Sequence, residues 1–450
     1  MDTSPVMRVR TMSADVRTLT ARWVFPASSP PLERGTVTVR GEKIEAVEPH
    51  GLRTADEDLG NVALIPGLVN AHTHLDLSGA RGLIPPTDPD HFTDWLKGVI
   101  AYRRTRSEAD TLADIKMGLA ECLRFGTTLI GDIASEGKSW DALSKAKTRA
   151  VCFYELIGLS EERAKAAGDR AYEFGVAVGH FPPPLLWGRS MEPQVPSGGG
   201  LDCASDPPPG SGFAHTDLPL NGGGGVVRLA FSPHAPYSAR RNLFGAGGAS
   251  DTFATHLAES PAEIELIDAH TGPFAEFLKT VGAWEPSGIS QLQPILTRSR
   301  LVGHYLFAHC NYLPLDHCKY IAGLHSIVYC PRTHAAFGHP PHPFRDFLAR
   351  GVRVCLGTDS LASNPELDLL AEARFVHAKY PDFPGEQLLK MVTLSGAEAL
   401  GWADECGSLE AGKSADVVAV PLADVEGDPH ELLFADTPGE RRTMWRGEWR

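Results

Sequence analysis

The sequence has no long block of lysine or arginine, and acidic residues outnumber basic ones. Its 56 Asp and Glu residues against 42 Lys and Arg residues give a formal net charge of -14 at pH 7. Proteins that bind nucleic acid or membrane surfaces usually carry a basic patch, because phosphate backbones and lipid head groups are negatively charged. The composition therefore argues against both kinds of partner and favours a small-molecule substrate.

Long apolar runs are also absent. No stretch approaches the roughly 20 apolar residues that cross a bilayer. The opening stretch MDTSPVMRVRTMSADVRTLTARWVFP lacks the apolar core of a secretory signal peptide. We therefore expect a cytoplasmic protein without a membrane span.

The eight cysteines are scattered along the chain and form no CxxC pair. This excludes the zinc deaminases that hold their metal with a PC-x-x-C motif. In a chain of 450 residues, scattered cysteines within apolar runs indicate reduced, buried thiols rather than a disulfide framework.

Both ends of the chain are rich in short, Val-rich runs separated by polar turns. With 42% apolar residues in 450, the chain can form two or three average domains, or one large barrel with an accessory domain. Isolated hairpins are not stable alone, so we predict that residues 1–65 and 407–450 form one composite β-sandwich domain. The runs are GTVTVRGEKIEAVEP, NVALIPG, GSLEAGKSADVVAVPL and RTMWRGEWR.

The middle of the chain, residues 66–406, alternates apolar β-like runs with helical stretches such as 110–124 and 261–281. Eight such runs predict an α/β fold, a parallel (β/α)8 TIM barrel, whose active site lies at the carboxyl ends of the strands. The runs are GLVNAHTHL, TTLIGDI, AVCFYELIGL, VVRLAFSPHAP, TFATHLAES, HYLFAHCN, HSIVYCPRT and VRVCLGTDS.

Two segments depart from this repeat. Residues 182–225 are rich in Pro and Gly, a composition typical of a surface loop or a disordered insertion without chemistry. Residues 238–251 are the only crossover between the fourth and fifth runs, and a parallel crossover normally needs a dozen or more residues and a helix. We therefore expect the fourth helix to be short or absent.

Five potential metal ligands fall at the ends of the predicted strands. His72 and His74 are two residues apart, so their side chains point to one side of a strand. His256, His309 and Asp359 end the fifth, sixth and eighth runs. A catalytic zinc needs three or four protein ligands and one open position. We assign His72, His74, His256 and Asp359 to the metal, and His309 to the substrate or the attacking water.

Each of these residues alone also fits a role without metal. Paired histidines occur on solvated strands, a single buried histidine is often a core residue, and Asp359 could cap the helix that follows it. Their joint placement at strand ends favours the metal site.

Four motifs in this order, PGLVNAHTHLDLSG, THLAES, FAHCNYLP and LGTDSLASN, resemble the amidohydrolase superfamily. They are most similar to its branch of cytosine, guanine and adenosine-type deaminases and related chlorohydrolases. The resemblance implies a barrel with a composite β domain, one divalent metal and hydrolysis at an electrophilic carbon. It carries the same ligand roles onto the four residues assigned above.

The resemblance also assigns two residues outside the ligand set. In deaminases of this kind the glutamate of HLAE, here Glu259, shuttles protons to and from the substrate ring, although an exposed acid in the first turn of a helix is the other interpretation. His234 in PHAPYS would face the substrate. The absence of lysine at the end of LAFSPHAPYS favours a single metal over a carboxylysine-bridged pair.

The predicted reaction is deamination of a 6-aminopurine-type compound. The metal lowers the pKa of its water toward roughly 7, Asp359 accepts the water's proton, Glu259 protonates the ring nitrogen and His309 orients the incoming hydroxyl. We expect the metal to be zinc, although the sequence does not identify it, because a His₃Asp set suits ferrous iron equally well. A chlorohydrolase or triazine-type hydrolase, and an inert metal-binding barrel, are the other possibilities.

The substrate is suggested by a looser similarity to aminodeoxyfutalosine deaminases. It rests on HTHLDLSG with FTDWLKGVIAYRR and on CPRTHAAFGH, with Asp76, Ser78, Trp95, Arg332 and His334 as pocket residues. The spacing of Trp95 from Phe92 and Val99 equally fits a core helix face. His339 and His342, on the same Pro-rich loop, are surplus as ligands, and a homodimer is possible.

Overall fold

The computed structural model describes residues 16–181, 226–244, 252–299 and 303–450. Its central element is an eight-stranded parallel sheet in the order β15-β14-β13-β12-β11-β10-β9-β8. Each predicted run contains one strand. In chain order they are Leu68–Thr73 (β8), Thr127–Ala134 (β9), Arg149–Leu156 (β10), Val226–Pro233 (β11), Thr252–Leu257 (β12), His304–His309 (β13), Ser326–Tyr329 (β14) and Arg353–Leu356 (β15).

The barrel closes where β15 meets β8. The only regular pairing described at this seam is a parallel bridge between Thr73 and Asp359, in which the Asp359 amide donates to the His72 carbonyl oxygen at 3.1 Å. Side chains add three further hydrogen bonds. Thr73 Oγ1 donates to the Asp359 carbonyl oxygen at 2.9 Å. The Asn70 amide donates to Thr358 Oγ1 at 2.8 Å, and the Thr358 amide donates to Asn70 Oδ1 at 3.1 Å. Closure therefore depends on residues adjacent to the predicted ligands.

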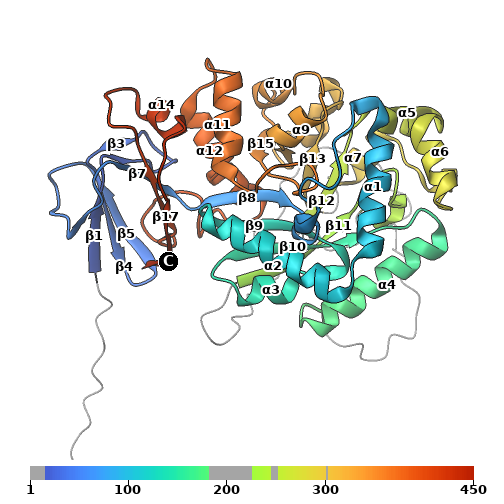
Figure 1. Cartoon of the computed structure of the whole chain (residues 1–450), viewed down its shortest axis with the longest axis horizontal. Coiled ribbons are helices and arrows are strands. Elements are labelled where there is room, and N and C mark those ends of the chain that lie inside the picture. The colour runs from blue at the N-terminus through green and yellow to red at the C-terminus, as the bar shows by residue number, and fades with distance from the viewer. Residues whose placement is uncertain (1–15, 182–225, 245–251, 300–302) are drawn as a thin grey trace, which may run out of the picture.

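Helices cover the outside of the barrel (Figure 1). The predicted helix 110–124 is α2, which begins at a capping box made by Ser107 and Asp110. The helices are Phe92–Thr105 (α1), Glu108–Arg124 (α2), Trp140–Lys145 (α3), Glu161–Ala177 (α4), Pro261–Ala269 (α5), Gly272–Thr280 (α6), Leu292–Ser299 (α7), Cys318–Ile321 (α8), Pro331–Ala336 (α9), Phe344–Ala349 (α10), Leu369–Lys379 (α11), Gly385–Met391 (α12), Leu394–Ala399 (α13) and Pro429–Phe434 (α14).

The helical stretch expected at 261–281 is two helices rather than one. α5 ends where His270 adopts a left-handed conformation with φ of 57°, and Gly272 follows with φ of 82°. Pro273 then occupies the first turn of α6, a position that proline favours because no backbone donor is lost there. The chain therefore turns at His270 and Thr271, and a second short helix, α6, begins at Gly272.

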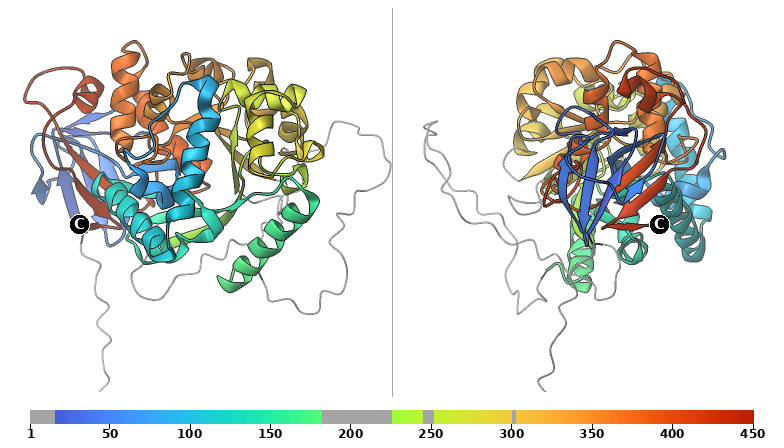
Figure 2. Two further views of the ribbon diagram at one scale, coloured as in Figure 1. Left: turned by 45° about the vertical axis from the view of Figure 1, so that its right-hand side comes forward. Right: turned by 90° about the vertical axis from the view of Figure 1, so that its left-hand side faces the viewer.

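Two smaller sheets lie beside the barrel. The four-stranded sheet contains N-terminal strands alone, whereas the six-stranded sheet contains strands from both ends of the chain, which lie side by side in Figures 1 and 2. One has the order β5-β4-β1-β6 and the other β18-β17-β16-β7-β2-β3. The strands are Val16–Thr20 (β1), Trp23–Val24 (β2), Leu32–Glu33 (β3), Thr36–Arg40 (β4), Lys43–Glu48 (β5), Glu57–Asp58 (β6), Val62–Pro66 (β7), Val417–Pro421 (β16), Arg442–Trp445 (β17) and Glu448–Trp449 (β18).

The two termini share one apolar core. β7 pairs antiparallel with β16, and Leu19 and Val37 pack in one cluster with Val417 and Met444. The predicted fold class, a TIM barrel with a composite β domain, is confirmed. The boundaries at residues 65 and 407 stay a prediction, because β7 leads into β8 with only Gly67 between them.

The remaining sequence expectations meet the structure in part. After β11, the described chain holds only the 3₁₀ turn Arg241–Leu243 (η4) before β12, as expected of a short fourth crossover, while residues 182–225 and 245–251 lie outside the described residues. The seven cysteines in the described ranges are free and buried. Within these ranges no helix is both long and apolar enough to cross a membrane.

Candidate active site

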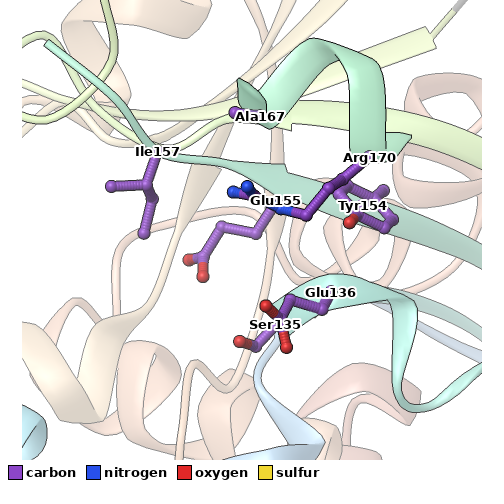
Figure 3. A pocket seen from close by; sticks show the side chains of 7 residues that line it. All are labelled: Ser135, Glu136, Tyr154, Glu155, Ile157, Ala167 and Arg170. Atoms are coloured by element: carbon purple, nitrogen blue, oxygen red, sulfur yellow. The ribbon is translucent and has the colours of Figure 1, made fainter. Parts of the chain in front are cut away.

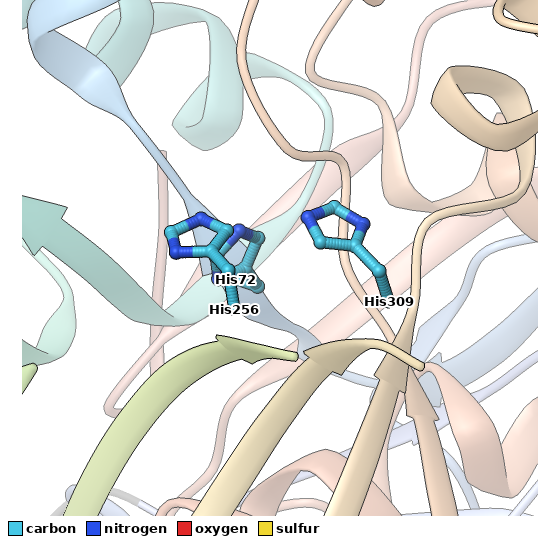
Figure 4. Close-up of side chains that lie close together, drawn as sticks. All are labelled: His72, His256 and His309. Atoms are coloured by element: carbon cyan, nitrogen blue, oxygen red, sulfur yellow. The ribbon is translucent and has the colours of Figure 1, made fainter. Parts of the chain in front are cut away.

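Three buried imidazoles meet above the carboxyl ends of their strands. His72 comes from β8, His256 from β12 and His309 from β13, and Figure 4 shows the three rings side by side. One ring nitrogen from each lies within 4.8 Å of the others. Side chains from three separate strands therefore converge on one point, as the barrel topology predicts.

His74 and Asp359 complete this cluster from the two sides of the seam. Asp359 Oδ1 lies 3.8 Å from His72 Nε2 and 3.7 Å from His74 Nε2. The Nε2 atoms of His74 and His256 are 3.1 Å apart. All four residues assigned to the metal from the sequence, His72, His74, His256 and Asp359, are thus in one buried cluster.

The orientation of His256 is fixed by its backbone neighbour. Its Nδ1 lies 2.9 Å from the carbonyl oxygen of His234, an acceptor, so Nδ1 carries the proton and Nε2 is left with a free lone pair. Burial lowers the pKa of His256 to about 3. Burial also lowers the pKa values of His72 and His74 well below the ordinary range, and neighbouring histidines add to the shift. Neutral imidazoles are the form that binds metal.

The residues present fit a divalent metal. His72 Nε2 and His74 Nδ1 are buried without a hydrogen-bond partner, and an unsatisfied buried polar group costs about 1–3 kcal/mol. Nitrogen and carboxylate oxygen donors together are typical of zinc sites. His309 belongs to two of the ligand groupings that the distances allow, so its assignment outside the ligand set stays a prediction.

The backbone around the cluster is strained. Ala258, His309, Cys310 and Asp359 have φ values of 52°, 68°, 55° and 56°, a region that costs non-glycine residues about 1–3 kcal/mol each. All four follow or end strands of the barrel mouth. Strain of this kind collects at functional sites, where the surrounding fold holds it in place.

Glu259 is buried beside His309 rather than exposed on a helix surface. Its Oε1 lies 3.4 Å from His309 Nε2, and an oxygen of Glu259, a nitrogen of His309 and an oxygen of Asp359 lie within 4.8 Å of one another. Burial, and then the negative charges of Asp359 and Glu263, raise the pKa of Glu259 well above its usual value. A carboxyl group in this environment retains its proton and can donate it.

His234 lies next to the cluster at the end of β11. Its ring centroid is 4.8 Å from that of His256, and its Nδ1 is 2.5 Å from Ser238 Oγ. The Nε2 atom faces Glu155 Oε1 at 3.8 Å. The ring therefore has one edge hydrogen-bonded to Ser238 and one edge that faces Glu155.

The sequence did not single out Arg103 and Glu155. Arg103 on α1 lies 3.0 Å from Asp76 Oδ2 and 3.5 Å from Glu155 Oε2. Both carboxylate side chains are nearly fully buried, at 5% and 3% exposed. Glu155 did carry a signal, since it is the only acidic residue in the apolar run AVCFYELIGL. Arg103 belongs to no motif.

Glu155 also lines a pocket of about 240 Å³ (Figure 3). The pocket lies where β9 and β10 end, and α4 forms one wall. The other lining residues are Ser135, Glu136, Tyr154, Ile157, Ala167 and Arg170. Glu155 is therefore shared between this pocket and the polar cluster beside His234.

Two predicted substrate contacts, Trp95 and Arg332, have other partners in the structure. Trp95 packs between Phe92 and Phe337, with ring centroids 5.5 and 5.1 Å away, although its indole nitrogen is buried without an acceptor. Arg332 pairs with Glu366 at 3.1 Å and Glu372 at 3.8 Å. Their substrate roles stay predictions, and the guanidinium of Arg332 is already neutralised.

The loop histidines form a packed group behind the cluster. His334 is buried against Tyr329 and His339, with centroids 5.6 and 5.2 Å away. His342 Nε2 donates to the carbonyl oxygen of His309 at 2.8 Å and stacks on Tyr329 at 4.0 Å. His342 therefore supports the position of His309, a role that the sequence did not suggest.

The chain is similar in sequence to known deaminases. A 5-methylthioadenosine/S-adenosylhomocysteine deaminase of Moorella thermoacetica is 27% identical over 420 residues, covering 89% of this chain and 84% of that protein. An aminodeoxyfutalosine deaminase of Nitratiruptor sp. is 25% identical over 405 residues, with 85% and 86% covered.

Among solved structures, the Helicobacter pylori aminofutalosine deaminase in complex with methylthio-coformycin superposes with a TM-score of 0.74 at 20% identity. The superposition covers 96% of this chain and 100% of the Helicobacter pylori chain. The sequence model described as Amidohydrolase family matches residues 63–448, which spans the barrel and, in the composite β domain, the strands β7, β16 and β17. The resemblance noted from the four motifs is confirmed, and the chain belongs to the amidohydrolase family.

Proposed function

We propose that this protein is a metal-dependent aminohydrolase that removes the 6-amino group of a purine nucleoside-like compound as ammonia. The observation that carries the proposal is the position of Glu259. This buried carboxyl group is 3.4 Å from His309 and adjoins the cluster of candidate metal ligands. A proton donor beside a metal is the arrangement that hydrolysis at an amino-bearing ring carbon requires.

The metal would be held by His72, His74, His256 and Asp359, whose buried nitrogen and oxygen atoms fit it. When bound, a divalent metal supplies a Lewis acid that brings the pKa of water toward roughly 7. Zinc is our choice of ion, and ferrous iron also suits these ligands.

The chain's own residues move the protons. Asp359 accepts a proton from the attacking water, and His309, hydrogen-bonded to the incoming oxygen, orients it toward the ring carbon. Glu259 gives its proton to the adjacent ring nitrogen, because negative charge on the ring would be costly in a buried site. The proton on Asp359 then passes to the amino group, which leaves as ammonia. Glu259 recovers a proton from the new hydroxyl group, which becomes the carbonyl of the product.

The choice of a 6-aminopurine rests on the relatives. Those named above as 5-methylthioadenosine/S-adenosylhomocysteine and aminodeoxyfutalosine deaminases act on compounds that share an adenine base. Aminodeoxyfutalosine is the substrate that we propose first, with 5-methylthioadenosine next. A cytoplasmic location and a homodimer stay predictions.

Ammonia release is the decisive assay. Zinc-loaded protein would be incubated with aminodeoxyfutalosine, 5-methylthioadenosine, adenosine, adenine, guanine and cytosine, beside elemental analysis of the same sample. We expect ammonia from the adenine nucleosides and one zinc ion per chain. No ammonia from any compound would overturn the proposal, and chloride release from a chlorotriazine would instead identify a chlorohydrolase.

A further inference from the structure

We propose that Asp76, Arg103 and Glu155 form a subsite that binds the vicinal hydroxyl groups of the substrate's ribose. The inference rests on the proposed function, since it places a nucleoside in the site. It assigns a role to two buried carboxylates and the partly exposed arginine between them, none of which takes part in the proton transfers.

The cluster is built from three separate elements. Asp76 lies on the 3₁₀ helix Leu75–Ala80 (η1) after β8, Arg103 lies on α1, and Glu155 lies near the end of β10. Arg103 bridges the two carboxylates, at 3.0 Å from Asp76 and 3.5 Å from Glu155. The guanidinium thus fixes both carboxylates in one orientation.

One oxygen of each carboxylate has no partner. Asp76 Oδ1 and Glu155 Oε1 are buried and make no hydrogen bond. A buried polar atom left in this way costs about 1–3 kcal/mol, and more when the group is charged. The second oxygen of Glu155 has only the 3.5 Å contact to Arg103. The cluster therefore has two acceptors available for donors from outside the chain.

Two fixed acceptors match a diol. Each ribose hydroxyl donates one hydrogen bond, and carboxylates are known to bind ribose hydroxyls in this way in dinucleotide sites. Hydrogen bonds to a charged acceptor contribute about 1.5–3 kcal/mol each. A neutral pair of donors also leaves the Arg103 ion pairs intact, whereas a cationic group would compete with the guanidinium for the same carboxylates.

The position of the cluster suits the far end of a nucleoside. The His234 ring lies 4.8 Å from that of His256, and His234 Nε2 lies 3.8 Å from Glu155 Oε1. The subsite is therefore one imidazole away from the candidate ligands. In a purine nucleoside the sugar and the carbon that bears the 6-amino group are at opposite ends of the base. A purine base that lies along His234, with its amino-bearing carbon at the candidate ligands, therefore has its sugar at Glu155. The pocket that Glu155 lines (Figure 3) adjoins the proposed position of the sugar.

The test compares substrates that differ by one hydroxyl. We would measure kcat/KM of the zinc-loaded full chain for adenosine, 2′-deoxyadenosine and 3′-deoxyadenosine. One lost hydrogen bond to a charged acceptor predicts a preference of about 10–100-fold for adenosine over at least one deoxy compound. In Glu155→Gln and Asp76→Asn this preference should fall to about threefold or less, because adenosine slows while the deoxy compound changes little.

Asp114→Asn is the matched control. Asp114 is also a buried carboxylate paired with an arginine, Arg106, and it accepts from Tyr102 of α1, but it is not part of the cluster. We expect this variant to keep the wild-type preference, even if its melting temperature falls. A preference lost equally in Asp114→Asn, or unchanged in both cluster variants, would overturn the subsite.

Binding of the reaction products separates this inference from the proposed function. Inosine and 2′-deoxyinosine cannot be deaminated, so calorimetry reports recognition alone. If no nucleoside releases ammonia but inosine binds more tightly than 2′-deoxyinosine in a Glu155-dependent way, the subsite stands and the proposed reaction fails. If ammonia is released without any dependence on the sugar hydroxyls, the reaction stands and the subsite fails.

Discussion

His256 Nδ1 donates a hydrogen bond to the carbonyl oxygen of His234 at 2.9 Å. This single contact fixes the tautomer of a candidate ligand, because it leaves Nε2 as the free lone pair directed at His74. It also ties the ends of β11 and β12 together at the barrel mouth.

Removing His256 tests the ligand set directly. We expect the zinc affinity of His256→Ala to fall. Mutating a residue that is only hydrogen-bonded to a metal ligand lowers affinity by roughly 10–100-fold, and the loss of a ligand itself should lower it further. Elemental analysis after dialysis measures this. His270→Asn is the control, because His270 is exposed and asparagine tolerates its left-handed backbone conformation. Full zinc retention in His256→Ala would remove His256 from the ligand set.

Replacing Glu259 separates proton transfer from metal binding. Glu259→Gln keeps the shape of the side chain but removes the proton donor, so ammonia release should fall by about 100–10,000-fold. Zinc content should be unchanged. Glu265→Gln, on the exposed face of the helix α5 that follows Glu259, should behave as the wild type. An active Glu259→Gln enzyme would contradict the proton-shuttle role.

Arg332 should contribute to stability rather than to substrate binding. Its ion pairs with Glu366 and Glu372 mean that Arg332→Ala leaves Glu372 buried with a weakened set of partners. We expect the free energy of unfolding to fall by about 1–3 kcal/mol, with KM unchanged. Chemical denaturation and steady-state kinetics measure the two quantities, and Arg332→Lys should retain part of the stability. A raised KM at normal stability would restore the substrate role predicted from sequence.

The sequence predicted the parts of the fold that depend on local pattern. Strands buried on both faces are continuous apolar runs, and all eight were identified. The break between α5 and α6 was missed, although Thr271, Gly272 and Pro273 mark it, because the apolar periodicity continues across the turn. The sequence predicted only that β7 and β16 belong to one domain. It did not predict that they pair or in which register, since register depends on contacts between the two ends of the chain.

The site was predictable where its residues end strands. A residue at a strand end has a position fixed by the barrel, so His72, His74, His256, His309 and Asp359 could be brought together from sequence alone. Arg332 could not be oriented, because Pro331 starts the helix α9 there and the structure pairs its side chain with Glu372 on α11. Arg103 and Glu155 belong to different elements and have no characteristic spacing.

The pH dependence of stability should show the effect of a histidine outside the site. Burial lowers the pKa of His304, at the start of β13, from 6.5 to about 4. The unfolded chain therefore binds more protons than the folded chain between these pH values, so the free energy of unfolding decreases as pH falls from 6.5 toward 4.

His304→Gln should lack this contribution. Urea unfolding of the metal-free protein between pH 4.5 and 8 measures it, and the wild type should lose stability relative to the variant only below about pH 6.5. A constant difference between the two proteins across the range would contradict the lowered pKa of His304.

Chelation should lower the melting temperature as well as the activity. A ligand that binds only the folded state stabilises it by about 2.7 kcal/mol at 100 times its dissociation constant. Thermal unfolding with and without a chelator measures the effect, and His256→Ala, with weakened zinc binding, should show little change. Equal melting temperatures for the wild type in both conditions would argue against a bound metal.

The seam between β8 and β15 gives the proposed metal a second consequence. His72 lies in the first strand of the barrel and His74 directly follows it, while Asp359 follows the last strand. One backbone bridge, the Thr73–Asp359 side-chain hydrogen bond and the Asn70–Thr358 pair make the closure there. An ion bound by these residues would link the first and the last strand of the barrel. Metal supply would then set how many copies survive in the cell, in addition to how fast each one works. Variants with weakened metal ligands would then reach lower protein levels in the cell, and this loss would be measurable without an activity assay.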